Sequence, residues 1–224
     1  MKEAPTDRGH SLGRIALRRL LHHRGAVAGG IIFLGIVVLA LAGLFFGDQF
    51  NNMVYEPRLS PSSAHWLGTD DLGRDMLVRL LYGAHLTLGT GLAVVALASM
   101  FGVPLGLVSA YAGGRIDNWL MRLMDMILAF PSILLAMAVV AALGFGLRMV
   151  VLAVAIVYIP KFARVARAAA LSERSLDYVR AAQALGCRPA RILFVHLLPN
   201  CLAPIIVLAT LSLATAILEA AALS

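Results

Sequence analysis

The chain has 224 residues, of which 60% are hydrophobic and only 14% are charged, and its formal net charge is +7 at pH 7. A soluble domain carries about 25% charged residues and must present much of its surface to water, so this composition excludes an ordinary water-soluble fold. Two cysteines, Cys187 and Cys201, do not suggest a disulfide framework or a metal site, and we expect both to be reduced thiols.

Five apolar stretches approach the roughly 20 residues that a helix needs to span the hydrocarbon core of a membrane. In chain order they are residues 26–47, 86–111, 123–147, 149–160 with a weak continuation towards 170, and 197–223. The fourth stretch is the weakest. The pattern predicts an all-α, polytopic bundle of transmembrane helices, with a kink at Phe130-Pro131 in the third span.

Lysine and arginine orient these spans. Six precede the first span, two lie between the second and third, and seven lie between the fourth and fifth, so 15 of the 19 basic residues fall on one side. The positive-inside rule therefore predicts a cytoplasmic N-terminus. The basic excess also meets anionic membrane lipid, so no nucleic-acid partner is needed to explain it.

The N-terminal region reads as a membrane anchor that is not cleaved, because its apolar stretch is too long for a signal peptide. Residues 11–24 form a possible amphipathic helix at the cytoplasmic surface. The expected organisation is a cytoplasmic segment at 1–25, an anchor at 26–47, a periplasmic segment at 48–85 and a helical core at 86–224.

A long basic loop at residues 172–199 has strong local signals. Ser172 or Glu173 can open a helix and Gly186 can end it, since glycine accepts the left-handed conformation of a helix C-terminus. Pro189 can start a second helix, and Pro199 marks the start of the fifth span. The loop is thus predicted to be a helix, a turn and a helix. The residues alone leave two alternatives open, a docking element for a partner or an amphipathic hairpin resting on the membrane.

Small and apolar side chains give this loop its possible contact surfaces. Ala182 and its neighbours would let another backbone approach closely, while larger apolar residues would supply packing contacts. The small residues are Ala181, Ala182 and Ala184, and the larger ones are Leu185, Ile192, Leu193 and Val195.

The loop resembles the "EAA" loop of the permease subunits of ATP-binding-cassette importers. The spacing of that motif is kept, although Arg180 replaces its glutamate and His196 its isoleucine, as is usual in the peptide-permease branch. Segments 17–34, 65–88 and 111–136 are similar to the same branch. The matching positions are Arg180, Ala181, Ala182, Gly186, His196, Leu198 and Pro199.

The resemblance implies a type I importer permease fold, in which members usually have six spans where about five are found here. It also implies that the loop docks into a cleft on an ATPase. The residues predicted to form this coupling loop are Tyr178, Arg180, Ala181, Ala182, Leu185, Gly186, Arg191, His196, Leu198 and Pro199.

The partners implied by the resemblance are a second, homologous permease subunit, two cytoplasmic ATPase subunits and a periplasmic solute-binding protein. The chain has no Gly-x-x-x-x-Gly-Lys-Ser/Thr phosphate loop, so we expect no cofactor and no enzymatic activity in it, with ATP bound by the partner subunits.

The implied substrates are dipeptides and oligopeptides. Nickel, glutathione or another small solute is the alternative within the branch, and an ion-coupled secondary transporter is the alternative from a different class. The secondary transporter is disfavoured because intramembrane charges are few.

Two intramembrane carboxylates are candidates for the translocation path or for structural roles. Asp125 is either such a functional group or, more plainly, an interfacial carboxylate near Arg122. Glu219 lies deeper in its span and could face the path or a partner subunit. Asp70, Asp71 and Asp75 read as acids at a helix start rather than as a metal site.

Overall fold

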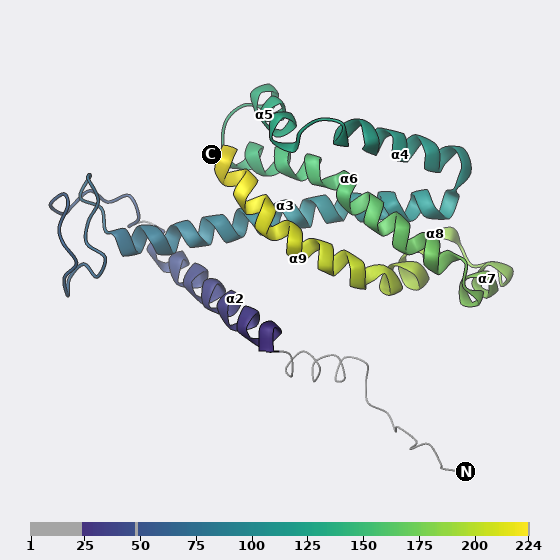
Figure 1. Cartoon of the computed structure of the whole chain (residues 1–224), viewed down its shortest axis with the longest axis horizontal. Helices are drawn as coiled ribbons and strands as arrows, with labels where there is room; N and C mark the ends of the chain where they lie inside the picture. Colours follow the sequence, from purple (N-terminus) through teal and green to yellow (C-terminus); the bar gives the residue numbers. More distant parts are fainter. Residues whose placement is uncertain (1–23, 48, 224) are drawn as a thin grey trace, which may run out of the picture. The chain divides into compact units, whose positions relative to one another are not determined.

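The computed structural model describes residues 24–47 and 49–223, and the chain divides into two compact units, Met1–Leu86 and Thr87–Ser224. The regular elements in the described residues are all helical, as predicted (Figure 1). The amphipathic helix predicted at 11–24 and almost all of the predicted segment 1–25 lie outside the described residues. The elements are α2 (Arg24–Gly43), η1 (Leu44–Phe46), α3 (Met76–Ala112), α4 (Gly114–Leu128), α5 (Ser132–Leu143), α6 (Leu147–Arg174), α7 (Asp177–Ala184), α8 (Pro189–Arg191), η2 (Ile192–Leu197) and α9 (Leu198–Leu223).

The first unit begins with the predicted anchor. Helix α2 and the short η1 together form an apolar helix, Arg24–Phe46, that is long enough to cross a membrane. Its end packs against the start of α3 at Gly43, where a Cβ atom would lie 2.2 Å from the carbonyl oxygen of Leu81. Only glycine, which has no side chain, allows the backbones of α2 and α3 to come this close.

The segment between α2 and α3 is irregular and is organised around Asp70. One Asp70 carboxylate oxygen accepts hydrogen bonds from the backbone N–H groups of Leu72 and Arg74, each at 2.9 Å. The other accepts from the side chains of Arg74 and Arg79. The backbone N–H of Arg74 and these further bonds outweigh desolvation and lower the pKa of Asp70 to about 2.

Asp75 closes the same segment by capping α3. Its Oδ1 atom accepts from the backbone N–H groups of Leu77 at 2.8 Å and Val78 at 3.2 Å, while Oδ2 lies 2.8 Å from Nδ1 of His65. Desolvation raises the pKa of Asp75, but the bonds from His65 and the two N–H groups outweigh it and hold that pKa below its ordinary value. The prediction of a helix-start carboxylate is therefore confirmed for Asp75, whereas Asp70 and Asp71 lie in the irregular segment before α3.

Replacing Asp70 with Asn should loosen residues 49–75, because an amide cannot pair with Arg74 and Arg79. A carboxylate with a depressed pKa stabilises the folded state above its unfolded pKa near 3.8, and that contribution is lost as the pH falls towards 2. We expect hydrogen exchange of this segment, corrected for the intrinsic rate, to accelerate below about pH 4 in the parent chain and already at pH 7 in Asp70→Asn. Equal protection of the two chains at pH 7 would contradict the assigned role.

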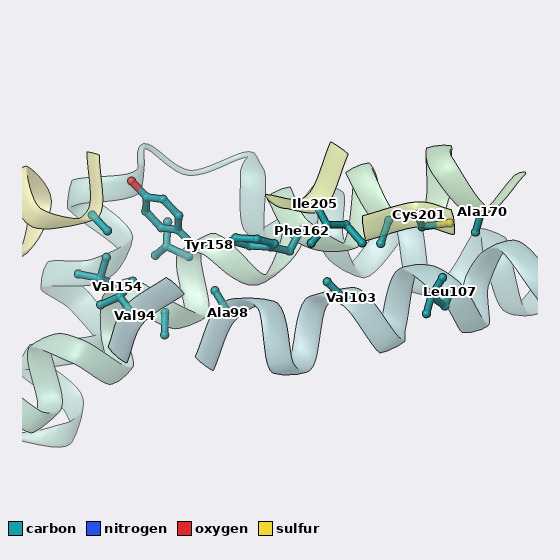
Figure 2. Close-up of a cluster of buried hydrophobic side chains, with 14 of the residues drawn as sticks. Val94, Ala98, Val103, Leu107, Val154, Tyr158, Phe162, Ala170, Cys201 and Ile205 are labelled. Carbon is teal, nitrogen blue, oxygen red and sulfur yellow. The ribbon is translucent and has the colours of Figure 1, made fainter. Parts of the chain in front are cut away.

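The second unit has one hydrophobic core, built where α3, α6 and α9 meet. Figure 2 shows Leu107 of α3, Tyr158 and Phe162 of α6, and Ile205 of α9 within this cluster. Tyr158, Phe162 and Leu107 have no exposed surface. Ala136 and Val140 of α5 belong to the same cluster, so the core is formed by residues from the second to the fifth predicted spans.

Two glycines bring the backbones of α3 and α6 together. A Cβ atom would lie 2.6 Å from the carbonyl oxygen of Ile159 at Gly102, and 2.2 Å from that of Ala163 at Gly106. Glycines four residues apart form a flat strip on a membrane helix, and such strips allow close helix packing in lipid. The backbone of α6 therefore packs directly against the glycine strip of α3.

The third predicted span is not one continuous helix. It is broken after α4, and α5 continues at an angle of 91°, so the kink predicted at Phe130-Pro131 is a complete break. Pro131 has an extended backbone with ψ 131°, which ends α4 and begins α5. Within the described residues, four helices could cross a membrane by length and composition, or five if this bent pair is one span.

The fourth span is longer than the sequence pattern predicted. It forms the 28-residue helix α6, which supplies more of the buried core than any other described helix. The basic residues in its second half lower the hydropathy without ending the helix. The fifth predicted span is also longer than expected, because α8, η2 and α9 form one apolar helix from Pro189 to Leu223.

Helix α4 is fastened to α6 by two ion pairs. Arg167 donates two hydrogen bonds to the Asp117 carboxylate, both at 2.6 Å, and Arg164 pairs with Asp125. The sequence placed Asp125 near Arg122 as an interfacial group, and the structure adds that its ion-pair partner is Arg164 of α6. Asp125 thus joins two helices, and its side chain is 58% exposed.

Glu219 joins α9 to α5. Its Oε1 atom accepts a 3.0 Å hydrogen bond from the Ser132 hydroxyl, while Oε2 is buried and has no hydrogen-bond partner among the described residues. One turn before Glu219 on α9, Thr215 accepts a 2.8 Å hydrogen bond from the hydroxyl of Tyr158 on α6. Glu219 therefore connects α9 to α5 through one hydrogen bond.

Candidate functional site

The basic loop forms a compact hairpin between α6 and α9. Helix α6 runs to Arg174, further than predicted, so the first loop helix begins at Asp177 and not at Ser172 or Glu173. Leu176 precedes α7 with an extended backbone, which turns the chain between the two helices. We call residues 175–191 the hairpin, and Figure 1 shows it at the end of the second unit beyond α6.

Gly186 makes the turn that was predicted for it. Its φ of +72° is left-handed, the Gly186 N–H donates to the carbonyl of Gln183 at 3.0 Å, and the Cys187 N–H donates to that of Ala182 at 3.1 Å. This pair of bonds is a Schellman motif, which satisfies the last carbonyl groups of a helix. A side chain at Gly186 would meet no neighbour, so the backbone conformation alone requires glycine there.

The second half of the hairpin leads directly into α9. Pro189 occupies the first turn of α8, as predicted, and Arg188 before it is extended. Residues Ile192–Leu197 then form a π-helix, a rare element that is frequent at functional sites, and His196 lies within it. Pro199 is the second residue of α9, which continues directly from α8 and the π-helix.

One side of the hairpin belongs to the core. Val179 and Ala182 of α7 are buried in the same cluster as Ile192 and Leu197 of the π-helix. Ala182, which has 7% exposure, was predicted to be the place where a partner backbone comes close. Its burial corrects this expectation, because the small side chain packs within this chain.

The other side of the hairpin is exposed and combines basic and apolar groups. Leu185 stands at the tip with 84% of its surface exposed, next to the Gly186 turn. Arg180 and Arg191 are exposed and have no acidic partner in the described part of the chain. We call this set the coupling face, and it consists of Arg180, Ala181, Leu185, Gly186 and Arg191.

Tyr178 connects the hairpin to both neighbouring helices. Its hydroxyl donates to a carboxylate oxygen of Glu173 on α6 at 2.7 Å and accepts from the Asn200 amide on α9 at 3.0 Å. Asn200 also donates to the carbonyl of His196 at 2.9 Å. Partial burial, followed by the bond to Glu173, raises the pKa of Tyr178 above its ordinary value. The hydroxyl therefore stays protonated and fixes α7 relative to α6 and α9.

Replacing Tyr178 with Phe should loosen α7 while keeping the ring. A hydrogen bond to a charged group contributes about 1.5 kcal/mol or more, so we expect hydrogen exchange of the α7 amides to accelerate by about tenfold. The matched control is Tyr55→Phe, since the Tyr55 hydroxyl has no hydrogen-bond partner among the described residues. Unchanged exchange in Tyr178→Phe would show that the network does not hold the hairpin.

The structure brings the predicted loop residues together in and beside the hairpin, and it places the two predicted intramembrane carboxylates elsewhere. Leu198 and Pro199 lie at the start of α9, and His196 contributes to the Tyr178 network through its carbonyl group. Asp125 and Glu219 lie elsewhere, on α4 and far along α9. Sequence reasoning missed Glu173 and Asn200 as positioning residues. The only signal for them was their polarity beside apolar helices.

Two families match the chain and together cover most of it. Residues 102–224 match the family described as "Binding-protein-dependent transport system inner membrane component". Residues 11–61 match the "N-terminal TM domain of oligopeptide transport permease C". The first match includes the whole hairpin and its flanking helices.

Similar proteins are found among bacterial transport components. The dipeptide transport system permease protein DppC of Alkalihalophilus pseudofirmus is 46% identical over 94% of this chain and 70% of its own length. The di/tripeptide transport system permease protein DppC of Pseudomonas aeruginosa is 45% identical over 90% of this chain and 69% of its own. The glutathione transport system permease protein GsiD of Pectobacterium atrosepticum is 41% identical over 92% of this chain and 70% of its own.

Proposed function

Because this chain belongs to the family of binding-protein-dependent transport system inner membrane components, we propose that it is a permease subunit of an ATP-driven importer for short peptides. The chain is a multi-pass protein of the inner membrane, and its helices are apolar enough to span the bilayer. Its task would be to form part of the path through the membrane, with the energy supplied by another subunit.

The observation that supports this function best is the coupling face. A short helix, α7, ends in a glycine turn beside exposed Leu185, and Arg180 and Arg191 have no acidic partner among the described residues, while the opposite side of α7 is packed into the core. An ATPase that binds this face and then changes conformation would move α7. The Tyr178 bonds to Glu173 and Asn200 would then pass that movement to α6 and α9.

The importer would be completed by subunits that bind ATP and solute. We propose two cytoplasmic ATPase subunits, a second homologous permease subunit and a periplasmic solute-binding protein as partners. ATP would be bound by the ATPase subunits, since this chain contains no phosphate-binding loop of the Gly-x-x-x-x-Gly-Lys-Ser/Thr type. A shift of the permease between two states requires the ATPase to bind those states with different affinity.

Short peptides are the preferred substrate because several similar proteins are named for peptide transport. A glutathione permease is also similar, so glutathione remains a candidate solute, as do nickel and other small solutes. The test is uptake of labelled dipeptides, glutathione and nickel by cells that lack the gene, with and without the chain supplied in trans. Restored dipeptide uptake supports the proposal, whereas restored glutathione or nickel uptake alone would replace the peptide with that solute.

The distribution of basic residues supports a cytoplasmic position for the hairpin and a periplasmic one for residues 49–75. In a Cys187→Ser background, we expect an impermeant maleimide to label Ser63→Cys but not Ala184→Cys in spheroplasts. Both positions are exposed, and Cys201 is buried and out of reach. Ala184→Cys should become reactive when the membrane is permeabilised. Labelling of Ala184→Cys before permeabilisation would reverse the proposed orientation.

A further inference from the structure

A basic and aromatic pocket lies on α4, and its lining includes no residue of the hairpin. Arg115, Asn118, Trp119 and Arg122 line it, and its volume is about 250 Å³. These residues are spaced three and four apart, so they share one face of the helix. Trp119 is 71% exposed, although a large aromatic side chain on a soluble surface would normally be covered.

The two acidic side chains of α4 are paired with basic side chains of α6. Asp117 and Asp125 point to α6, where Arg167 and Arg164 neutralise them. Arg115 and Arg122 lie on the pocket side, and neither guanidinium group has a hydrogen-bond or ion-pair partner in the part of the chain that the structure describes. The pocket therefore carries two positive charges that no acidic group of the described residues pairs with.

Apolar side chains continue the exposed face beside the pocket. Ile116, Leu123 and Met126 are 55%, 48% and 53% exposed. At 100° per residue, they and Trp119 cover the strip of α4 next to the two arginines. The same face thus offers positive charge, hydrogen-bond donors and an apolar surface side by side.

We propose that this face of α4 binds an anionic phospholipid, with the phosphate of its headgroup in the pocket. The guanidinium groups of Arg115 and Arg122 would pair with the phosphate oxygens, and the Asn118 amide would donate a further hydrogen bond. The Trp119 indole suits the boundary between headgroups and acyl chains. The acyl chains would lie along Ile116, Leu123 and Met126. A free phosphate ion would leave this apolar strip unused.

Trp119 can report this binding directly, because Trp66 is the only other tryptophan in the sequence. The full chain with Trp66→Phe is placed in nanodiscs of phosphatidylcholine that contain a few per cent of brominated phosphatidylglycerol or of brominated phosphatidylcholine. Bromine quenches indole fluorescence at short range, so we expect much stronger quenching by the brominated anionic lipid. Each arginine should contribute about fivefold to this preference.

The matched variants separate a site from general attraction of a basic protein to an anionic bilayer. Arg115→Gln with Arg122→Gln should abolish the preference, whereas Arg148→Gln, on a different helix, should leave it intact. Equal quenching by the two lipids, or a preference that survives the double substitution, would overturn the proposal. Added inorganic phosphate should not displace the lipid, and displacement would assign the pocket to a free anion instead. Fluorescence quenching does not depend on transport, so this experiment tests lipid binding independently of the proposed function.

Discussion

Replacing Gly186 with Val should abolish peptide uptake while the chain still inserts in the membrane. The left-handed backbone at this position costs an L-residue about 1–2 kcal/mol, and a β-branched side chain more. The chain would escape this strain by giving up the Schellman bonds to Gln183 and Ala182. Helix α7 has only eight residues, and so short a helix does not persist without its cap and its packing. We expect uptake to fall by about tenfold or more.

The matched control at this position is Gly186→Asn. Asparagine tolerates the left-handed conformation, and the open space around Gly186 accommodates its side chain. Uptake in this variant should remain close to that of the parent chain. If Gly186→Val also transports normally, the turn is not needed for coupling. If Gly186→Asn fails as badly as Gly186→Val, the conformational explanation is wrong.

Replacing Leu185 with Asp should separate the ATPase from the permease without unfolding the hairpin. Leu185 is 84% exposed, so a carboxylate there is solvated in the isolated chain. In an ATPase cleft the same carboxylate would be desolvated without a partner. A central interface residue contributes about 2 kcal/mol or more, which corresponds to about 30-fold weaker binding. We expect loss of ATPase co-purification together with loss of uptake.

The control for Leu185→Asp is Val54→Asp, which places the same charge on an apolar residue that is 75% exposed in the first unit. This variant should retain the ATPase during purification. Hydrogen exchange of α7 should be the same in Leu185→Asp and in the parent chain, which shows that docking and not folding is affected. Normal ATPase binding by Leu185→Asp would exclude the tip of the hairpin from the interface.

The helical architecture was predictable because hydropathy over 20 residues is a strong signal. The break between α4 and α5 was not predictable to its full extent. Pro131 indicated a kink, but the structure has a 91° turn together with two ion pairs, from Asp117 and Asp125, that join α4 to α6. Their partners, Arg164 and Arg167, looked like cytoplasmic loop charges. A hydropathy average cannot show which side of a helix such residues occupy.

The hairpin was partly predictable for a similar reason. Gly186 and Pro189 determine backbone geometry locally, so their roles were visible in the sequence. Ala182 indicated a close contact, but a small side chain does not say which backbone it approaches, and it packs within this chain. Glu173 and Asn200 are 27 positions apart in the sequence. Both form hydrogen bonds with the Tyr178 hydroxyl, and this arrangement depends on the position of α7 in the folded chain.

The measurement that tests the central claim most directly is photocrosslinking from the coupling face in the assembled importer. A benzoylphenylalanine probe at Leu185 should give a single adduct with the ATPase subunit, and a probe at Val54 should give none. We expect the Leu185 adduct to disappear when Gly186→Val is introduced into the same chain. An importer that transports peptide normally while the Leu185 probe forms no ATPase adduct would contradict the assignment of this face as the ATPase-docking surface.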